Sequence, residues 1–427
     1  MDGDRMTGRV CLIVHNQLWN DARVKKEASS LRDAGWQVTV VARPEPGRPG
    51  TEDWQGIRIL RPRYRSAVTE SLRGSFDSPS SARRRFLPAV VAALRRNRVR
   101  RFLSDLFRNW MFELKFLRAA LSADADVYQA NDVDTLLVAW LASRLRRARL
   151  VYDSHELWLG SPKYLREMSA LGRLRDRLTE RALVYAADAV IHVTPGRAKV
   201  MQEMYPRIRK MHIVENCPEV TEKLSSDRLR ETSGAPAGTT LVLYQGILAN
   251  ERGLENLLEA ARELRGENLR IVLVGHDCTG GRLPAMATAP DLAGIVTLLP
   301  PVKSEELPFL TAGADMGLIL FQNTCLNHYY SLPNKLYEYM MAGIPVIASD
   351  LPEIARVVRE NGCGILVDPE DPASIARGIR DLLSRPAERL SMGQRAREAA
   401  TTRHCWPVQA RELISLYSSL AGEIRGR

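Results

Sequence analysis

Short apolar runs alternate with amphipathic helical stretches along most of the chain. RVCLIV (9–14) is followed by a helical stretch that begins near Asp21 and ends at Gly35, and then by WQVTVVA (36–42). Two buried strands joined by a helix within about 35 residues form a parallel βαβ unit. The opening of the sequence therefore predicts an α/β fold with a parallel sheet.

The alternation occurs in two series. Further strands are expected at 56–61, 126–130, 148–153 and 189–193, and then at 239–246, 268–275, 294–300, 314–321, 344–349 and 364–367. Between the series, EKLSSDRLRETSGAPAGT (222–239) is polar, has little apolar periodicity and is expected to connect two domains. We predict two doubly wound, Rossmann-like domains facing a central cleft, over 1–215 and 216–403, and a C-terminal helix over 404–427 that crosses back to the first domain.

Length and cysteine usage narrow the class of protein. At 427 residues the chain suits two domains of ordinary size. Its six cysteines stand singly, which favours a reduced, cytoplasmic compartment over a disulfide framework or a zinc site. The start MDGDRMTGRVCLIV is unlike a signal peptide, and no window approaches the ~18 apolar residues that cross a membrane.

The net charge of +11 comes from one segment. Residues 61–120 hold fifteen Arg or Lys and four Asp or Glu, so the rest of the chain is neutral. An amphipathic helix is expected at 86–118, with Trp110, Leu114 and Leu117 on its apolar face, and it suits an anionic membrane surface as partner. The alternative is a helix packed on its own domain with a solvated basic face. No nucleic acid partner is expected, because no stacking sheet or helix-turn-helix accompanies the charge.

Two segments of the second series carry candidate binding residues. After the strand TTLVLYQG, Gly246 begins a loop that leads to Arg252 at a helix start. Helix N-termini bind phosphate through backbone amides, and an arginine adds paired hydrogen bonds. A glycine after a strand is also ordinary turn geometry, so this signal is weak by itself.

The second segment is YYSLPNKLYEYMMAGIPVIASD (329–350), a loop that turns into a short helix. Amides of Leu332, Asn334 and Lys335 at the helix start could meet an anion, and Glu338 one turn on could hold a sugar hydroxyl. The alternatives are a solvated lysine and an exposed helix acid.

These segments resemble glycosyltransferase family 4, the glycogen-synthase-like, group 1 type with the GT-B fold. LPNKLYEYMMAGIPVIASDLPEI (332–354) is similar to the donor-site segment of that family, and YQGILANERGLENLLEA (244–260) to its phosphate loop. IVLVGHD, MHIVENCPEV and NDARVKKEASSLRDAGWQVTVVA also fit, so five segments in the family's order cover nearly the whole chain.

The resemblance implies a retaining hexosyltransferase that moves a sugar from a nucleotide-diphosphate sugar to a hydroxyl acceptor, with no cofactor and no bound metal. Glu338 would hold the donor ribose, Arg252 the pyrophosphate, and His155 would lie near the transferred sugar. With Lys335, these are the candidate catalytic residues. The donor-binding candidates are Gly246, Arg252, Gly275, Tyr330, Leu332, Pro333, Asn334, Lys335 and Glu338.

Polar residues that follow strands of the first series are acceptor-side candidates, because ligands gather at this edge of open α/β sheets. Loop-starting Asn and Asp are also common helix caps, so that alternative stays open. The candidates are Asn20, Asp21, Asn131, Asp132 and Glu156.

The chain departs from the family pattern at two positions. Tyr330 stands where the first acid of the E-x7-E pattern is expected, and Ile247 stands where an arginine usually follows the loop glycine. We hypothesise that Lys335 supplies the missing charge. A GT-B sugar-nucleotide epimerase, and a non-catalytic relative that binds a membrane surface, stay open as alternatives.

Overall fold

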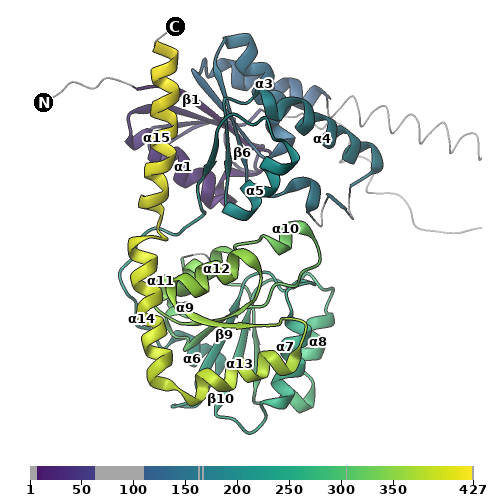
Figure 1. Ribbon diagram of the computed structural model, residues 1–427, viewed down its shortest axis with the longest axis vertical. Coiled ribbons are helices and arrows are strands. Elements are labelled where there is room, and N and C mark those ends of the chain that lie inside the picture. The colour runs from purple at the N-terminus through teal and green to yellow at the C-terminus, as the bar shows by residue number, and fades with distance from the viewer. Residues whose placement is uncertain (1–6, 63–109, 162–163, 166–167, 304, 426–427) are drawn as a thin grey trace, which may run out of the picture. The chain divides into compact units, whose positions relative to one another are not determined.

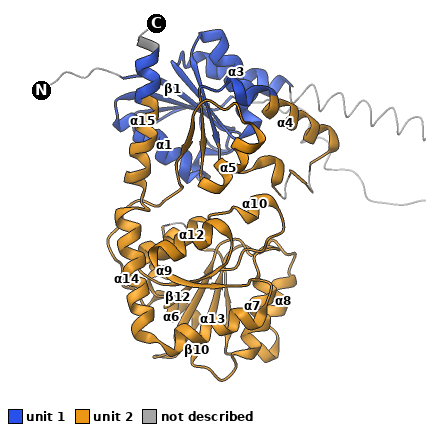
Figure 2. Cartoon of the chain, in the orientation of Figure 1, with its two compact units in different colours: residues 1–153, 182–188, 418–427 blue, residues 154–181, 189–417 orange. Residues whose placement is uncertain are grey.

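The computed structural model in Figure 1 describes residues 7–62, 110–161, 164–165, 168–303 and 305–425. Contacts divide the chain into two units, coloured blue and orange in Figure 2. Unit 1 holds residues 1–153, 182–188 and 418–427, and unit 2 holds residues 154–181 and 189–417. This division follows contacts rather than the sheets, and the predicted domains at 1–215 and 216–403 stay a prediction.

The first sheet has eight strands in the order β3-β4-β2-β1-β5-β6-β7-β8. β1 pairs in parallel with β2 and β5, as do β2 with β4, β5 with β6 and β7 with β8, whereas β3 is antiparallel to β4. The strands are β1 Gly8–Ile13, β2 Trp36–Val41, β3 Thr51–Trp54, β4 Ile57–Leu60, β5 Val127–Asn131, β6 Arg149–Ser154, β7 Ala189–His192 and β8 Met211–Ile213.

Helices connect these strands as the sequence pattern predicts. The Asp21 carboxylate caps α1 by accepting a hydrogen bond from the Val24 amide at 3.0 Å. The helical segments are η1 Leu18–Asn20, α1 Ala22–Asp33, residues 110–122, α3 Val133–Arg146, η2 Trp158–Gly160, α4 Ala170–Leu183, η4 Val184–Ala186 and α5 Pro195–Met204.

The second sheet is parallel throughout, in the order β11-β10-β9-β12-β13-β14. Its strands are β9 Thr240–Gln245, β10 Leu269–Val274, β11 Val296–Leu299, β12 Met316–Ile319, β13 Val346–Ser349 and β14 Gly364–Val367. Its helices are α6 Arg228–Ser233, α7 Leu254–Glu263, α8 Arg282–Ala287, η5 Pro290–Leu292, α9 Leu307–Ala312, α10 Leu326–Tyr329, α11 Asn334–Ala342, α12 Pro352–Asn361, α13 Pro372–Ser384 and α14 Pro386–Thr402. The last helix, α15 (Trp406–Arg425), begins in unit 2 and ends in unit 1.

Apolar clusters on both faces of this sheet explain its doubly wound form. Leu241 and Leu243 of β9 pack with side chains of α11, α12 and α14. Val242 and Tyr244 of the same strand point the other way and pack with α7, α8 and α13. Because the strand order reverses at β9, the carboxyl end of β9 is where an open α/β sheet binds its ligand.

All the strands predicted from apolar runs are present, and the α/β fold class is confirmed. The structure adds β3, a polar edge strand, and the short strand β8. Among the described residues, no helix combines the length and hydropathy needed to cross a bilayer.

Most of the basic segment, residues 63–109, lies outside the described residues. In the part that is described, Phe116 is fully buried and its ring meets that of His15 edge-on at 4.8 Å. Trp110 is 61% exposed. The described end of the expected helix thus packs on its own unit through Phe116, and contact of 86–118 with a membrane stays a prediction.

Candidate functional site

The chain makes a tight turn where β9 ends. Gly246 has a φ of +118°, a region that side chains rarely adopt, and its amide donates to the Val274 carbonyl at 2.9 Å. A Cβ on Gly275 would lie 1.7 Å from the Gly246 carbonyl oxygen. The ends of β9 and β10 can therefore approach this closely only because position 275 is a glycine.

Helix α11 is fixed against β9 by a buried tyrosine. The Tyr339 hydroxyl donates to the Leu243 carbonyl at 3.0 Å and accepts from the Gln245 amide at 3.1 Å. Burial raises the pKa of Tyr339 well above its usual value, so the phenol stays neutral. These two bonds bring the first turns of α11 beside the end of β9.

Glu338 faces this junction and is oriented by Gln245. The Gln245 side-chain amide donates to Glu338 Oε2 at 2.6 Å, and its oxygen accepts from Thr311 Oγ1 at 2.7 Å. Gln245 is 1% exposed, so its orientation is fixed by these partners. Its role was not predicted, although a glutamine that ends an otherwise apolar strand is a signal for a polar contact there.

Two cationic side chains lie near the same turn. The Arg252 guanidinium stacks on the Phe321 ring at 3.9 Å, and burial lowers its pKa. Its Nη1 atom is buried without a hydrogen-bond partner among the residues that the structure describes. The Lys335 Nζ lies 3.7 Å from the centre of the Tyr244 ring. Burial, and then the charge of Arg252, lower the pKa of Lys335 to about 7.

The structure thus gathers Gly246, Gly275, Arg252, Lys335 and Glu338 at the carboxyl end of β9. The remaining donor-side candidates lie between the end of α10 and the first residue of α11. Tyr330 directly follows α10, and its ring meets that of Tyr329 edge-on at 4.9 Å, whereas Pro333 precedes the first residue of α11. Leu332 is half-buried and Asn334 is exposed.

His155 follows β6 and belongs to unit 2. Its carbonyl oxygen accepts from Arg197 Nη1 at 2.8 Å, and Nη2 of the same guanidinium donates to the Asn327 carbonyl of α10 at 3.1 Å. The Leu157 amide also donates to Asn327 Oδ1 at 3.1 Å. Within unit 2, the backbone around His155 is therefore tied to the helix that precedes Tyr330.

The acceptor-side candidates have contacts that favour structural roles for two of them. Asp21 is the cap of α1, and Asn131 is buried, donating to the Ile13 carbonyl at 3.1 Å. Asp132 precedes α3 with a φ of +64°, and Glu156 is exposed. Asn20 is the last residue of η1. An acceptor role for these residues stays a prediction.

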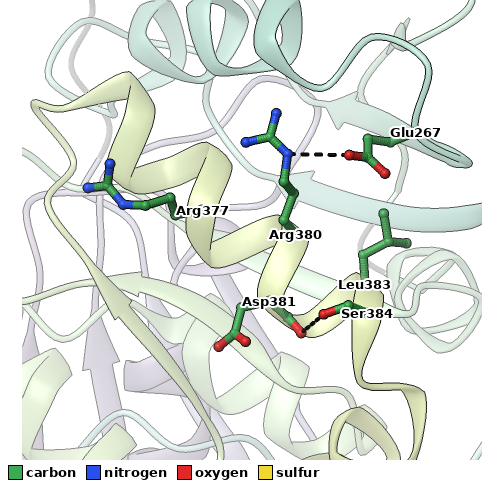
Figure 3. A pocket seen from close by; sticks show the side chains of 6 residues that line it. All are labelled: Glu267, Arg377, Arg380, Asp381, Leu383 and Ser384. Atoms are coloured by element: carbon green, nitrogen blue, oxygen red, sulfur yellow. Dashed lines mark hydrogen bonds and ion pairs between the residues drawn. The ribbon is translucent and has the colours of Figure 1, made fainter.

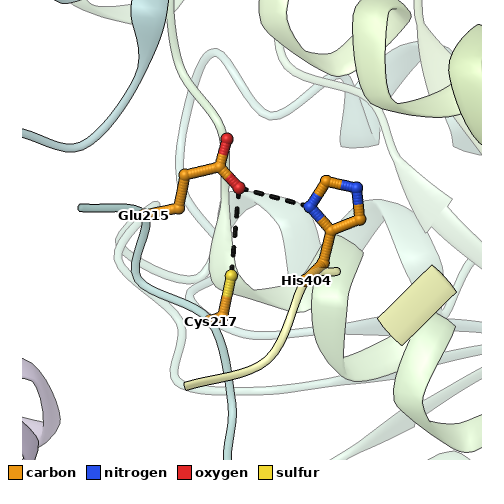
Figure 4. Close-up of side chains that lie close together, drawn as sticks. All are labelled: Glu215, Cys217 and His404. Atoms are coloured by element: carbon orange, nitrogen blue, oxygen red, sulfur yellow. Dashed lines mark hydrogen bonds and ion pairs between the residues drawn. The ribbon is translucent and has the colours of Figure 1, made fainter. Parts of the chain in front are cut away.

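A polar cluster that the sequence did not predict joins the residues just after β8 to the turn between α14 and α15 (Figure 4). One potential metal-ligand atom from each of Glu215, Cys217 and His404 lies within 4.8 Å of the other two, a spacing that could hold a metal ion. The Glu215 carboxylate already accepts from the Tyr337 hydroxyl at 2.5 Å and from Arg356 Nη2 at 2.9 Å. Because a guanidinium balances its charge, the cluster is satisfied as a hydrogen-bonded ion pair without a metal.

A surface pocket on α13 lies away from the candidate site. It is lined by charged side chains, among them Arg380, which pairs with Glu267 at 3.3 Å (Figure 3). Glu267 precedes β10, whereas Gly246 follows β9. The pocket therefore lies at the amino ends of these parallel strands and the candidate site at their carboxyl ends. We therefore assign the candidate site to the β9–α11 junction and not to this pocket.

Comparison with known families matches both halves of the chain to glycosyltransferases. Residues 21–217 match the glycosyl transferase 4-like domain, and residues 225–399 match the glycosyl transferases group 1 family. The chain belongs to glycosyltransferase family 4, group 1 type. This glycosyltransferase is 26% identical over 298 residues to the D-inositol 3-phosphate glycosyltransferase of Corynebacterium urealyticum, covering 66% of the chain and 69% of the relative. Its match to the enzyme of that name from Nocardia farcinica is 26% over 301 residues, covering 68% and 65%.

Solved structures of the GT-B class share the fold over nearly the full chain. Sucrose-phosphate synthase from Thermosynechococcus elongatus has a TM-score of 0.73 at 19% identity, covering 97% of this glycosyltransferase and 99% of that chain. Alr3699/HepE of Anabaena, in complex with UDP and glucose, has a TM-score of 0.68 at 16% identity, covering 96% and 100%. At this identity the likeness shows the GT-B fold.

Proposed function

We propose that this glycosyltransferase moves a hexose from a nucleotide-diphosphate sugar to a hydroxyl acceptor with retention of anomeric configuration. The observation that carries the proposal is the meeting of Glu338, Arg252 and Lys335 around the Gly246 turn. A carboxylate suits ribose hydroxyls, and two basic groups beside a glycine turn suit a diphosphate.

The donor would lie along the end of β9. Glu338, held by Gln245, would accept hydrogen bonds from the ribose. Arg252 and the first amides of α11 would take the diphosphate, which is the leaving group, and stabilise the charge that develops on it. Solved structures of Alr3699/HepE, which shares this fold, are complexes with UDP and with UDP-glucose, which makes uridine nucleotides the first donors to test.

In the transfer step, the acceptor oxygen forms a bond to the anomeric carbon as the bond from that carbon to the β-phosphate oxygen breaks. Attack on the face from which the diphosphate departs retains the configuration, and the acceptor proton passes to a β-phosphate oxygen. His155 would orient the transferred sugar and not serve as an obligatory base. The proposal needs no metal and no cofactor, and places the reaction in the cytoplasm, with 86–118 as a contact to an anionic membrane.

The first experiment measures thermal shifts of the purified protein with UDP, GDP, ADP and their hexose conjugates. The best donor is then incubated with an acceptor panel that includes inositol phosphates, because the matched relatives are named for inositol 3-phosphate. Release of nucleoside diphosphate that requires the acceptor, with NMR showing a retained anomeric configuration, supports the proposal.

Two other results would contradict it. Conversion of the donor sugar without any acceptor would favour an epimerase, the reading that Tyr330 in place of the first acid keeps open. If no nucleoside diphosphate binds, the proposed donor site is wrong.

A further inference from the structure

Lys335 carries an amine whose charge is not balanced by a carboxylate in contact with it. Among the residues that the structure describes, its Nζ forms no ion pair and lies over the Tyr244 ring at 3.7 Å. The same atom lies 3.2 Å from the position that a Cβ on Gly246 would occupy. The amine therefore reaches the turn where the diphosphate is proposed to bind.

Two charged residues near this amine affect its protonation. Arg252, in the loop before α7, disfavours a second positive charge, and Glu338, on α11 itself, favours it. Of the elements packed on α11, α9, β12 and β13 contain no titratable residue. From α14, Arg397 bonds to the Met341 carbonyl, at the other end of α11.

The residue at the usual arginine position, Ile247, cannot supply a positive charge to the diphosphate site. Ile247 is apolar and 57% exposed, and its carbonyl accepts from the Tyr244 hydroxyl at 2.9 Å. Arg252 is therefore the cation that remains on the loop itself. The diphosphate of a sugar nucleotide would bring about two negative charges, and that of a free nucleoside diphosphate about three, to a place where the loop supplies one positive charge.

We propose that Lys335 takes up a proton from solvent as the nucleotide-diphosphate donor binds, and so becomes the second cation of the diphosphate site. The amine gains the proton and becomes an ammonium, and no other bond forms or breaks. The inference rests on the proposed function, since it needs a diphosphate at the Gly246 turn.

In the protein without ligand, Lys335 is suited to take up a proton near neutral pH. Burial and the Arg252 charge hold the pKa of Lys335 at about 7, so a large fraction of the amine is unprotonated just above neutral pH. A diphosphate next to Nζ raises that pKa, and binding then consumes up to one proton. Affinity consequently falls as the pH rises above about 7, by up to about tenfold per pH unit.

The test measures binding of UDP, GDP and ADP, and of the matching nucleosides, by titration calorimetry at pH 6.5, 8 and 9. At pH 8, the apparent enthalpy for the tightest diphosphate should differ between buffers of different ionisation enthalpy, as uptake of a proton requires. Lys335→Met should weaken that diphosphate at least about tenfold at pH 6.5, the loss of one charge-assisted contact, and leave the nucleoside unchanged. Lys335→Arg should keep the affinity and flatten its pH dependence. The exposed Lys223, replaced by Met, is the matched control.

The outcomes separate this inference from the proposed function. If the wild-type protein binds none of the diphosphates, the proposed function fails. If it binds one without proton uptake, or if Lys335→Met binds it as well as wild type does, the inference fails and the proposed function stands. The buffer comparison uses the unmodified protein, so it decides the question even if a variant is unstable.

Discussion

Gln245 and Glu338 join the end of β9 to α11 through a 2.6 Å hydrogen bond from the glutamine amide to the carboxylate. Glu338→Gln should weaken nucleoside and nucleoside diphosphate about equally, by about ten- to a hundredfold, because a charged acceptor for the shared ribose is lost. Calorimetry with both ligands checks this.

The matched control is the exposed Glu370, replaced by Gln, which should leave both affinities unchanged. A loss confined to the diphosphate would contradict a ribose role for Glu338. It would place the carboxylate near the phosphates instead.

Gly275 should tolerate a methyl group less well than any glycine with free space around it. Gly275→Ala would place a Cβ 1.7 Å from the Gly246 carbonyl oxygen, so the backbone must move, and we expect a loss above about 3 kcal/mol in the free energy of unfolding. Gly266 has a φ of +91° with nothing within 4 Å, so Gly266→Ala isolates the conformational cost of about 1–2 kcal/mol. Urea denaturation of both variants measures the difference, and equal losses would contradict the close approach.

Strands of this fold could be predicted well where they are buried on both faces. β9 occupies Thr240–Gln245, within the apolar run at 239–246 that predicts it, because parallel strands covered by helices on both faces read as continuous apolar segments. β3 was missed because TEDW is polar and pairs only with β4 among the described strands. Its strand character comes from that antiparallel partner and not from its own pattern.

The site could be predicted in part. The motif residues of α11 lie within one short segment, so their shared location follows from sequence. Gln245 was missed because its role depends on Thr311 and Glu338, which are 66 and 93 positions away. Tyr244 has the sequence signature of an ordinary strand residue, but its ring packs against the amine of Lys335. Such contacts depend on tertiary packing, which a pattern of residue types does not contain.

Lys335 should make folding stability depend on pH near neutrality. Its pKa falls from 10.5 in the unfolded chain to about 7 in the folded protein. Between these values the unfolded chain binds the extra proton, so the free energy of unfolding rises with pH, by up to about 1.4 kcal/mol per unit. Lys335→Met removes this term and should stabilise the protein most at pH 6 and least near pH 10. Denaturant titrations across that range check the trend; a constant difference between variant and wild type would contradict it.

Glu215 should contribute the opposite dependence in acid. Burial pushes the pKa of its carboxyl up, but hydrogen bonds from His404 and Tyr337 outweigh burial and hold the pKa below its usual 4.5. The stabilisation is complete above pH 4.5 and is lost as the pH falls through the lower pKa of the folded state.

Glu215→Gln keeps the size of the side chain but leaves Arg356 without its charged partner. The gap in unfolding free energy between wild type and this variant should be largest near pH 6 and shrink towards pH 3, because acid removes the same charge from the wild type. Tyr337→Phe, which removes one donor to the carboxylate, should cost about 1–2 kcal/mol at pH 6. A gap that stays constant from pH 6 to pH 3 would show that the Glu215 charge does not stabilise the cluster.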